Sequence, residues 1–338
     1  MRNDFSISGD FTINAEPSDH LIDSIVRSLS GKKPALVVAI GGGSVLDSAK
    51  AVSAMIPLQE PIIRYLEEVG DKQHPGVKIP FLAVPTTAGT GSESTKNAVI
   101  SGSGKGGAFK RSLRHDNFVP DITVIDPELM LSCPPSITAA CGLDAFTQLL
   151  ESYVSTDANP LTDALAIDGM RAIARSLVPS CTDEWNNIHH RSGMAYGAML
   201  SGITLANAGL GVVHGLAAPA GALTHVPHGV FCARVLPPAV EWNIHRLKQL
   251  GNAGNHFLEK YTHAGFILNS GIDGDVDTGC DILIKQLWTW VQELEIPGLS
   301  GYLTDKEILR TISEQSGNKN NPVELTCEER LAILLKCL

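Results

Sequence analysis

Four side chains in two stretches of the sequence have the types and the spacing of a metal site. Asp144 and Gln148 lie four residues apart in a segment with helical periodicity, which places both on one face of a helix. His214 and His228 follow in two later segments that prolines separate. A divalent cation would accept one carboxylate oxygen, two imidazole nitrogens and the amide oxygen, and would keep a position for a substrate. The sequence therefore predicts a metal site, although a single histidine is more often structural.

A glycine turn between a buried apolar run at 35–40 and a helical pattern at 45–55 has the properties of a phosphate site. Glycines let backbone N–H groups approach an anion closely, and the N-terminus of the following helix favours negative charge. The alternative is a turn that merely joins a strand to a helix. The candidate contacts are Gly41, Gly42, Gly43, Ser44 and, in the first turn of the helix, Asp47.

A second loop, rich in hydroxyl groups, follows the next apolar run at 79–87. Two such loops after successive strands favour a nucleotide site over two independent turns. Lys110 adds a cation that is expected near the same sheet edge, although a lone lysine is usually a surface charge. The hydroxyl donors singled out here are Thr86, Thr87, Thr90 and Ser92.

The wider pattern predicts an α/β domain followed by an all-helical domain. Apolar runs at 35–40, at 79–87 and from Ile122 to an end at Asp126-Pro127 read as strands that alternate with helices, which indicates a parallel sheet. After Pro134 the spacing is helical up to Leu338, so we expect a nucleotide-binding domain at 1–130 and a metal-binding domain at 131–338. Helix breaks are expected at Asn159-Pro160, Pro179, Pro227, Pro237-Pro238, Pro297-Gly298 and Asn321-Pro322.

Composition narrows the class of protein. A chain of 338 residues with a net charge of −10 and no large Lys/Arg cluster is not expected to bind nucleic acid. Seven cysteines without a Cys-x-x-Cys pair, and no apolar leader, indicate reduced thiols and a cytoplasmic location. No apolar stretch has the length of a membrane span, and the longest candidate, 195–222, reads as a buried helical region. We therefore expect no membrane partner.

Taken together, these stretches resemble the iron-containing (group III) alcohol dehydrogenase family. The motifs that carry the resemblance, in order along the chain, are "AIGGGSVLDSAKA", "PTTAGTGSE", "VIDPEL", "GLDAFTQLLESYVS", "GLGVVHGLAAPAGALTHVPHG" and "NPVELT". The resemblance implies a Rossmann-like domain for NAD or NADP, an all-α domain for a divalent metal, and a dehydroquinate synthase-like architecture. It also implies an alcohol and its aldehyde or ketone as substrates, iron (alternatively zinc, manganese or nickel) as the metal, and a homodimer or higher homo-oligomer.

Carried over position by position, the resemblance assigns roles to the same residues. The glycine turn with Asp47, the hydroxyl loop and Lys110 match cofactor contacts, and Asp144, His214 and His228 match catalytic metal ligands. The chain departs from the family at Gln148 and Ala218, where the family has histidines. Only forty residues precede the glycine turn, fewer than the family pattern implies, so the sheet is expected to be truncated.

Two functions follow from this pattern. The first is a metal-dependent NAD(P) oxidoreductase that transfers hydride between a nicotinamide and a small alcohol or carbonyl compound. The second is a catalytically impaired homologue whose fold serves as an oligomeric or binding scaffold. The coincidence of Gln148, Ala218 and a short N-terminal segment motivates the second.

Overall fold

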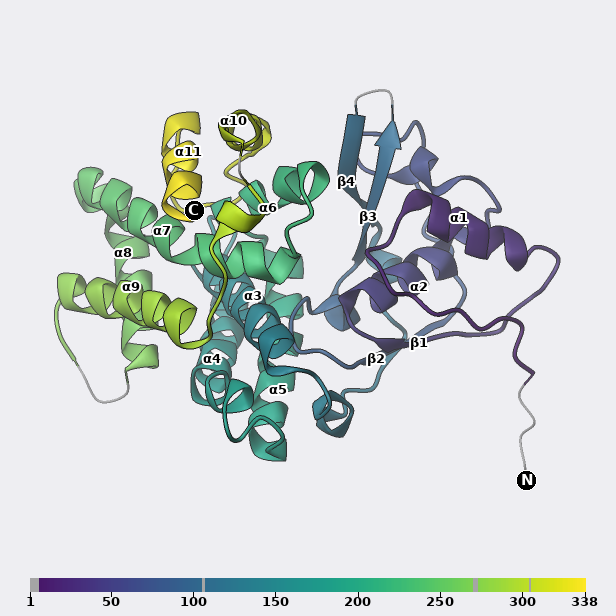
Figure 1. Cartoon of the computed structure of the whole chain (residues 1–338), viewed down its shortest axis with the longest axis horizontal. Coiled ribbons are helices and arrows are strands. Elements are labelled where there is room, and N and C mark those ends of the chain that lie inside the picture. The colour runs from purple at the N-terminus through teal and green to yellow at the C-terminus, as the bar shows by residue number, and fades with distance from the viewer. Residues whose placement is uncertain (1–5, 105–106, 270–272, 304) are drawn as a thin grey trace. The chain divides into compact units, whose positions relative to one another are not determined.

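The structure is a computed structural model that describes residues 6–104, 107–269, 273–303 and 305–338. The chain forms two compact units. The first contains the residues up to Thr86 together with Ser92–Ile125, and the second contains Thr87–Gly91 and Asp126–Leu338. Figure 1 shows strands and helices in the first unit and helices in the second.

The first unit contains the predicted parallel sheet. Its strands lie in the order β1-β2-β5, and both pairings are parallel, with Val37 opposite Phe81 and Leu82 opposite Ile122. The helices and strands of this unit are α1 (Asp19–Ser28), β1 (Val37–Gly41), α2 (Gly43–Met55), β2 (Phe81–Pro85), β3 (Asn97–Gly104), β4 (Gly107–Arg114) and β5 (Ile122–Thr123).

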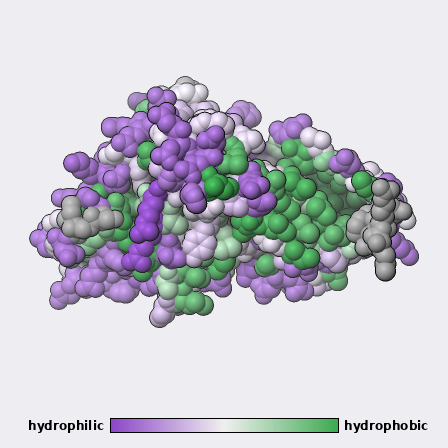
Figure 2. All heavy atoms as spheres, turned by 90° about the horizontal axis from the view of Figure 1, so that it is seen from below, coloured by the Kyte–Doolittle hydropathy of each residue, from purple (hydrophilic) through white to green (hydrophobic). Residues whose placement is uncertain are grey.

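The two faces of this sheet have different environments. Side chains alternate between faces along a strand, and on one face Ala39, Phe81 and Ala83 pack against Leu46 of α2. Figure 2 shows apolar residues gathered on the surface of this unit. The large apolar side chains that the other face exposes, with their exposed fractions, are Val38 (52%), Ile40 (63%), Ile122 (53%) and Val124 (44%).

One predicted strand boundary of the first unit was wrong, and one element was not predicted. The third strand was predicted to start at Ile122 and end at Asp126-Pro127, but it ends at Thr123, and Asp126 instead caps a 3₁₀ turn by accepting a bond from the backbone N–H of Glu128. The stretch that includes Lys110 belongs to a separate two-stranded sheet, and its expected place near the edge of the parallel sheet stays a prediction. It forms an antiparallel hairpin of β3 and β4, which the glycine- and serine-rich sequence did not indicate.

The second unit confirms the all-helical prediction: its described residues contain no strand. Its central helix is α3, which packs against α4, α5 and α7 and buries most of its side chains. The helices of this unit are α3 (Pro135–Tyr153), α4 (Pro160–Ser176), α5 (Ile188–Ala208), α6 (Val212–Leu223), α7 (His228–Gln249), α8 (Asn255–Leu268), α9 (Val276–Glu293), α10 (Lys306–Gln315) and α11 (Cys327–Lys336).

Prolines end helices at some of the predicted places but not at Pro237 and Pro238. Asn159 and Pro227 are helix N-caps as expected, whereas α7 continues through the proline pair. A proline at 238 cannot donate to the carbonyl of Arg234, four residues earlier, and the Cys337 thiol contacts that carbonyl at 3.4 Å instead. The prediction of a break at this pair was therefore wrong.

The apolar region at 195–222 is divided between α5 and α6. Of the helices in the described ranges, none alone is both long and apolar enough to cross a bilayer. Only α5 and α6 taken together are long and apolar enough, and this pair bends by 98° at the break between the two helices.

Candidate metal centre and cofactor loops

One buried face of α3 carries three polar side chains that define the candidate metal centre. Asp144, Gln148 and Glu151 are 2%, 3% and 6% exposed. Their spacing of four and then three residues places them along one stripe of the helix. The predicted helical placement of Asp144 and Gln148 is therefore correct.

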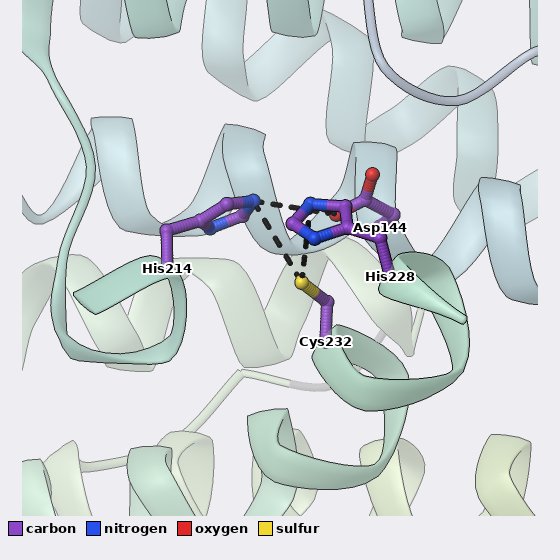
Figure 3. Close-up of side chains that lie close together, drawn as sticks. All are labelled: Asp144, His214, His228 and Cys232. Carbon is purple, nitrogen blue, oxygen red and sulfur yellow. Dashed lines mark hydrogen bonds and ion pairs between the residues drawn. The ribbon is translucent and has the colours of Figure 1, made fainter. Parts of the chain in front are cut away.

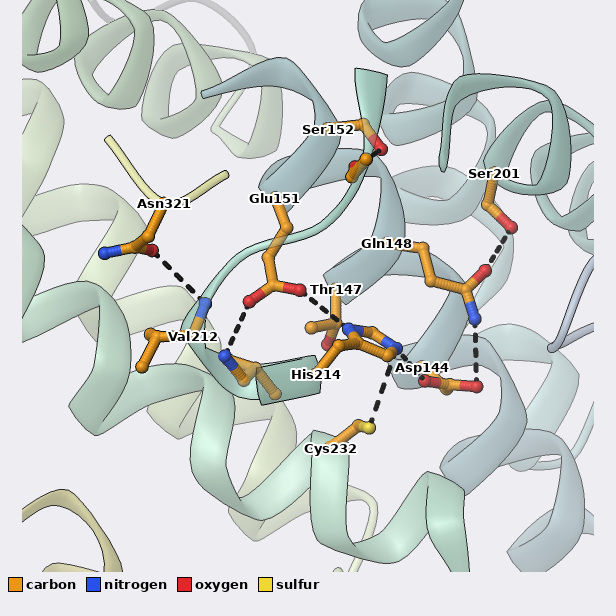
Figure 4. Close-up of polar contacts among 12 residues, drawn as sticks. Asp144, Thr147, Gln148, Glu151, Ser152, Ser201, Val212, His214, Cys232 and Asn321 are labelled. Atoms are coloured by element: carbon orange, nitrogen blue, oxygen red, sulfur yellow. Dashed lines mark hydrogen bonds and ion pairs between the residues drawn. The ribbon is translucent and has the colours of Figure 1, made fainter. Parts of the chain in front are cut away.

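Glu151 holds the start of α6 and the ring of His214. One carboxylate oxygen accepts the backbone N–H of Val213 at 2.7 Å, and the other lies 2.7 Å from His214 Nδ1 (Figure 4). A carboxylate can only accept, so His214 Nδ1 carries a proton; when a cation displaces the proton on Nε2, the lone pair of that atom can bind the cation. That Nε2 atom lies 3.3 Å from Asp144 Oδ1.

The first two turns of α7 add two donors to this centre. His228 is the first residue of the helix, and its Nε2 atom lies 3.7 Å from Asp144 Oδ1. Cys232, one turn later, places its Sγ atom 3.8 Å from His214 Nε2 and 3.7 Å from His228 Nε2 (Figure 3). The donor atoms of Asp144, His214, His228 and Cys232 all lie within 4.8 Å of one another.

Gln148 lies beside this cluster, but its oxygen points elsewhere. Its Nε2 group donates to Asp144 Oδ2 at 3.1 Å, and its Oε1 atom accepts from the Ser201 hydroxyl at 2.7 Å (Figure 4). Because an ionised carboxylate accepts only, the amide must turn its NH₂ group towards Asp144. The structure thus brings Asp144, His214 and His228 together and directs the Gln148 oxygen to Ser201.

The charges around the centre favour a cation. Burial works to raise the pKa of Asp144, but the imidazoles of His228 and His214 outweigh it and hold that pKa below its ordinary value. Burial also opposes charge on His214, yet Cys232, Glu151 and Asp144 raise its pKa well above the ordinary value. Without a metal, burial raises the pKa of the Cys232 thiol to about 12. The carboxylates of Asp144 and Glu151 therefore lie in a site that stabilises a bound positive charge.

The donor set fits a divalent metal ion. In the described part of the chain, Asp144 Oδ1 is buried and has no hydrogen-bond partner, although it faces two imidazole nitrogens. In the metal-free protein the raised pKa of His214 lets its charged ring compensate this oxygen, and a bound cation would take that place. One oxygen and two nitrogens are ligands that zinc and iron accept.

Replacing Glu151 with glutamine should weaken metal binding while leaving every direct ligand in place. Carboxylates that hold the far nitrogen of a ligating histidine are worth about 10–100-fold in metal affinity. We expect a loss of that size in a metal titration followed by elemental analysis. The exposed Glu259 on α8 provides the control, Glu259→Gln. Equal affinity for both variants would show that Glu151 has no part in the centre.

The predicted cofactor turn has the form of an anion site. Gly42 is the N-cap of α2 with φ −76° and ψ −176°, and no side chain caps this end. No acidic residue lies in the first turn, so the prediction that Asp47 lies there was wrong, because α2 begins at Gly43 and Asp47 is its fifth residue. The terminal backbone N–H groups of α2 are therefore not covered by a capping side chain of the same helix. Gly41 ends β1, and its carbonyl accepts the N–H of Thr86.

Asp47, Ser92 and Lys110 make contacts inside the first unit. One oxygen of Asp47 accepts the Ser92 hydroxyl at 2.5 Å and the other accepts the N–H of Val99 at 2.9 Å. Lys110 pairs with Glu16 at 2.8 Å, and its side chain is 12% exposed. These contacts give the three residues structural roles within the unit. Their role as cofactor contacts stays a prediction, as does that of Thr86, Thr87 and Thr90.

Sequence reasoning missed two residues of the metal centre. Cys232 was counted only among the seven cysteines, although His228-x-x-x-Cys232 has the spacing of two donors on one helix face. Glu151 lies seven residues after Asp144, again on the same face, and was not singled out. Both signals were present in the sequence.

Comparisons with known proteins agree with this arrangement. The family model described as iron-containing alcohol dehydrogenase matches residues 5–127, and the model for the C-terminal part of the Fe-containing alcohol dehydrogenase family matches residues 138–338. Alcohol dehydrogenase 4 of Saccharomyces cerevisiae is 35% identical over 92% of this chain and 78% of its own length. The NAD-dependent methanol dehydrogenase of Bacillus methanolicus is 31% identical over 96% of this chain and 82% of its own length.

Solved structures similar to this chain also include alcohol and aldehyde oxidoreductases. A 1,3-propanediol oxidoreductase superposes with a TM-score of 0.85 at 29% identity, covering 96% of this chain and 83% of that one. A sulfoacetaldehyde reductase from Bifidobacterium kashiwanohense in complex with NAD+ superposes with a TM-score of 0.79 at 25% identity, covering 96% and 81%. The chain therefore belongs to the iron-containing alcohol dehydrogenase family.

Proposed function

We propose that the protein is a metal-dependent NAD(P) oxidoreductase that interconverts a small alcohol and its aldehyde or ketone. The observation that carries this proposal is the buried Asp144 Oδ1 atom, which has no hydrogen-bond partner in the described residues and faces the Nε2 atoms of two histidines. A carboxylate oxygen in this position is suited to a metal ion. Membership of the iron-containing alcohol dehydrogenase family supports the reaction class.

When bound, a divalent metal would supply Lewis acidity at the substrate oxygen and NAD(P) would supply the hydride acceptor or donor. The protein contributes position and charge. The ion would be held by Asp144, His214 and His228. Glu151 keeps the Nδ1 atom of His214 protonated, so that the Nε2 atom of this ring faces the ion. Asp144 and His214 are almost fully buried, whereas the His228 side chain is 33% exposed. A substrate is therefore expected to approach beside His228.

The glycine turn would hold the cofactor phosphates. The N-terminus of α2, with Gly42 as its N-cap and Gly43 as its first residue, has no side-chain cap and offers backbone N–H groups to an anion. A relative whose solved structure contains NAD+ supports a nicotinamide cofactor. The proton of the alcohol needs a route other than the histidine that the family pattern has at position 218, because that residue is Ala218 here.

A turnover assay tests the proposal. Purified protein, stripped of metal and reloaded with zinc or ferrous iron, is given short-chain alcohols or aldehydes with NAD(H) or NADP(H). Metal-dependent formation or loss of reduced nicotinamide is expected. If no substrate is turned over and nicotinamide fluorescence detects no binding at millimolar cofactor, the oxidoreductase proposal is overturned and the scaffold reading is favoured.

Oligomeric state and location remain predictions. The exposed apolar face that carries Val38, Ile40, Ile122 and Val124 supports self-association into a homodimer or higher homo-oligomer. All seven cysteines are free, which supports a reducing, cytoplasmic environment. Light scattering on the purified protein tests the first of these predictions.

A further inference from the structure

The metal centre lacks the histidine that the family pattern places at position 148, and the structure offers a different donor in its place. Gln148 donates its NH₂ group to Asp144 Oδ2 and directs its oxygen to Ser201. Gln148 therefore fixes the orientation of the Asp144 carboxylate and leaves the Oδ1 atom of that carboxylate available to an ion. This makes Gln148 a positioning residue for Asp144.

We propose that Cys232 is the fourth ligand, so that Asp144, His214, His228 and Cys232 together hold the ion, and a substrate oxygen would join them as a further ligand. Cys232 is fully buried and lies one helical turn after His228, so both side chains point from the same face of α7. Figure 3 shows the thiol and the two imidazoles directed towards one another. The inference rests on the proposed function of this site.

The distances fit one tetrahedral ion. Zinc bound at about 2.0–2.1 Å by nitrogen or oxygen and at about 2.3 Å by sulfur holds its donors about 3.3–3.6 Å apart. Asp144 Oδ1 lies 3.3 Å from His214 Nε2 and 3.7 Å from His228 Nε2. Cys232 Sγ lies 3.8 and 3.7 Å from the same two nitrogens. The other two donor pairs lie within 4.8 Å, so movements of up to about an ångström would bring all four donors to bonding distance.

The charge of the ligand set also fits. One carboxylate and one thiolate with two neutral imidazoles compensate a divalent cation within the ligand set, and Glu151 adds a further negative charge beside His214, so charge permits a thiolate but does not by itself select it over an amide. A soft sulfur donor shifts preference towards zinc and away from sites that rely on nitrogen and oxygen donors alone. We therefore expect this member of the family to bind zinc more tightly than ferrous iron.

X-ray absorption of the zinc-loaded protein tests the ligand without any substitution. We expect a sulfur neighbour at about 2.3 Å together with nitrogen or oxygen neighbours at about 2.0–2.1 Å. A shell of nitrogen and oxygen alone overturns the inference, even if the enzyme is active. A zinc–sulfur shell in a protein that turns over no alcohol keeps the inference and overturns the proposed function.

Cobalt substitution tests which cysteine is involved. Cobalt(II) bound by a thiolate absorbs strongly in the near ultraviolet, and this band should be present in the parent and in Gln148→Ala but absent in Cys232→Ser and Cys232→Ala. The matched control is Cys280→Ala, which removes another fully buried thiol in the second unit. Circular dichroism confirms that each variant is folded. A full band in both Cys232 variants, or its loss in Cys280→Ala alone, contradicts the assignment.

Metal affinity gives an independent measure. Loss of a direct thiolate ligand should raise the zinc dissociation constant by at least about a hundredfold in Cys232→Ala, while Gln148→Ala, which removes only a positioning contact, should lose about tenfold or less. The reverse order of the two losses would identify the residue at 148 as the ligand and overturn the inference.

Discussion

Replacing Asp144 with asparagine is expected to abolish metal retention and to lower kcat/KM by at least about a thousandfold, because a Lewis-acid metal contributes several kcal/mol to the transition state. The substitution keeps the shape of the side chain and removes its charge. Asp144 Oδ1 faces both histidine Nε2 atoms, so the loss affects the whole donor set. Elemental analysis and steady-state kinetics measure the two effects.

A control variant separates this effect from a general loss of structure. Asp168 lies on α4, and its carboxylate accepts a bond from the exposed Tyr196 hydroxyl at 2.7 Å. Asp168→Asn removes one negative charge from the same unit and should leave metal content and kinetics unchanged. If Asp144→Asn keeps full metal content and full activity, the carboxylate is not a ligand.

Replacing Gly42 with valine is expected to raise the cofactor dissociation constant at least about tenfold, because a branched side chain occupies the space in which the pyrophosphate approaches the N-terminus of α2. Gly42 is a better site for this test than Gly41. A Cβ atom on Gly41 would lie 2.6 Å from Val45 Cγ2 and disturb the turn itself, whereas Gly42 has backbone angles that valine adopts. Fluorescence titration with reduced nicotinamide measures the constant.

The control for this variant is Gly301→Val. No heavy atom lies within 4 Å of a Cβ built on Gly301, so the added side chain is tolerated without a neighbouring shift. Both variants should show the circular dichroism of the parent. Should Gly42→Val bind cofactor as tightly as Gly301→Val does, the phosphate site lies elsewhere.

The parts of the fold that the sequence predicted best have a strong periodic signal. The apolar runs before Gly41 and Pro85 became β1 and β2, and the segment around Asp144 became α3. The hairpin of β3 and β4 was missed because glycine and serine dilute the alternation that identifies a strand. The pair Pro237-Pro238 was read as a helix break, although α7 continues through it and packs against α3, α9 and α11.

In the candidate site, residue type and spacing identified three donors but did not identify Cys232 or the orientation of Gln148. Asp144, His214 and His228 were identified because carboxylate and imidazole are familiar metal donors at these spacings, and the structure brings them together. Cys232 was classified with the other cysteines by count, so its position one turn after His228 was not used. The orientation of Gln148 depends on Ser201, which is fifty-three residues away in sequence and reaches the amide only through the packing of α5 on α3.

The most direct measurement of the central claim is a metal titration of the stripped protein with activity recorded at each step. Chelator-treated enzyme receives zinc in small increments, and bound zinc and alcohol-dependent formation of reduced nicotinamide are measured on the same samples. If the cluster of Asp144, His214, His228 and Cys232 holds the working ion, activity should rise in proportion to bound metal and reach a plateau at about one equivalent per chain. Full activity in the stripped protein, or a protein that retains no metal at any concentration, would contradict the account.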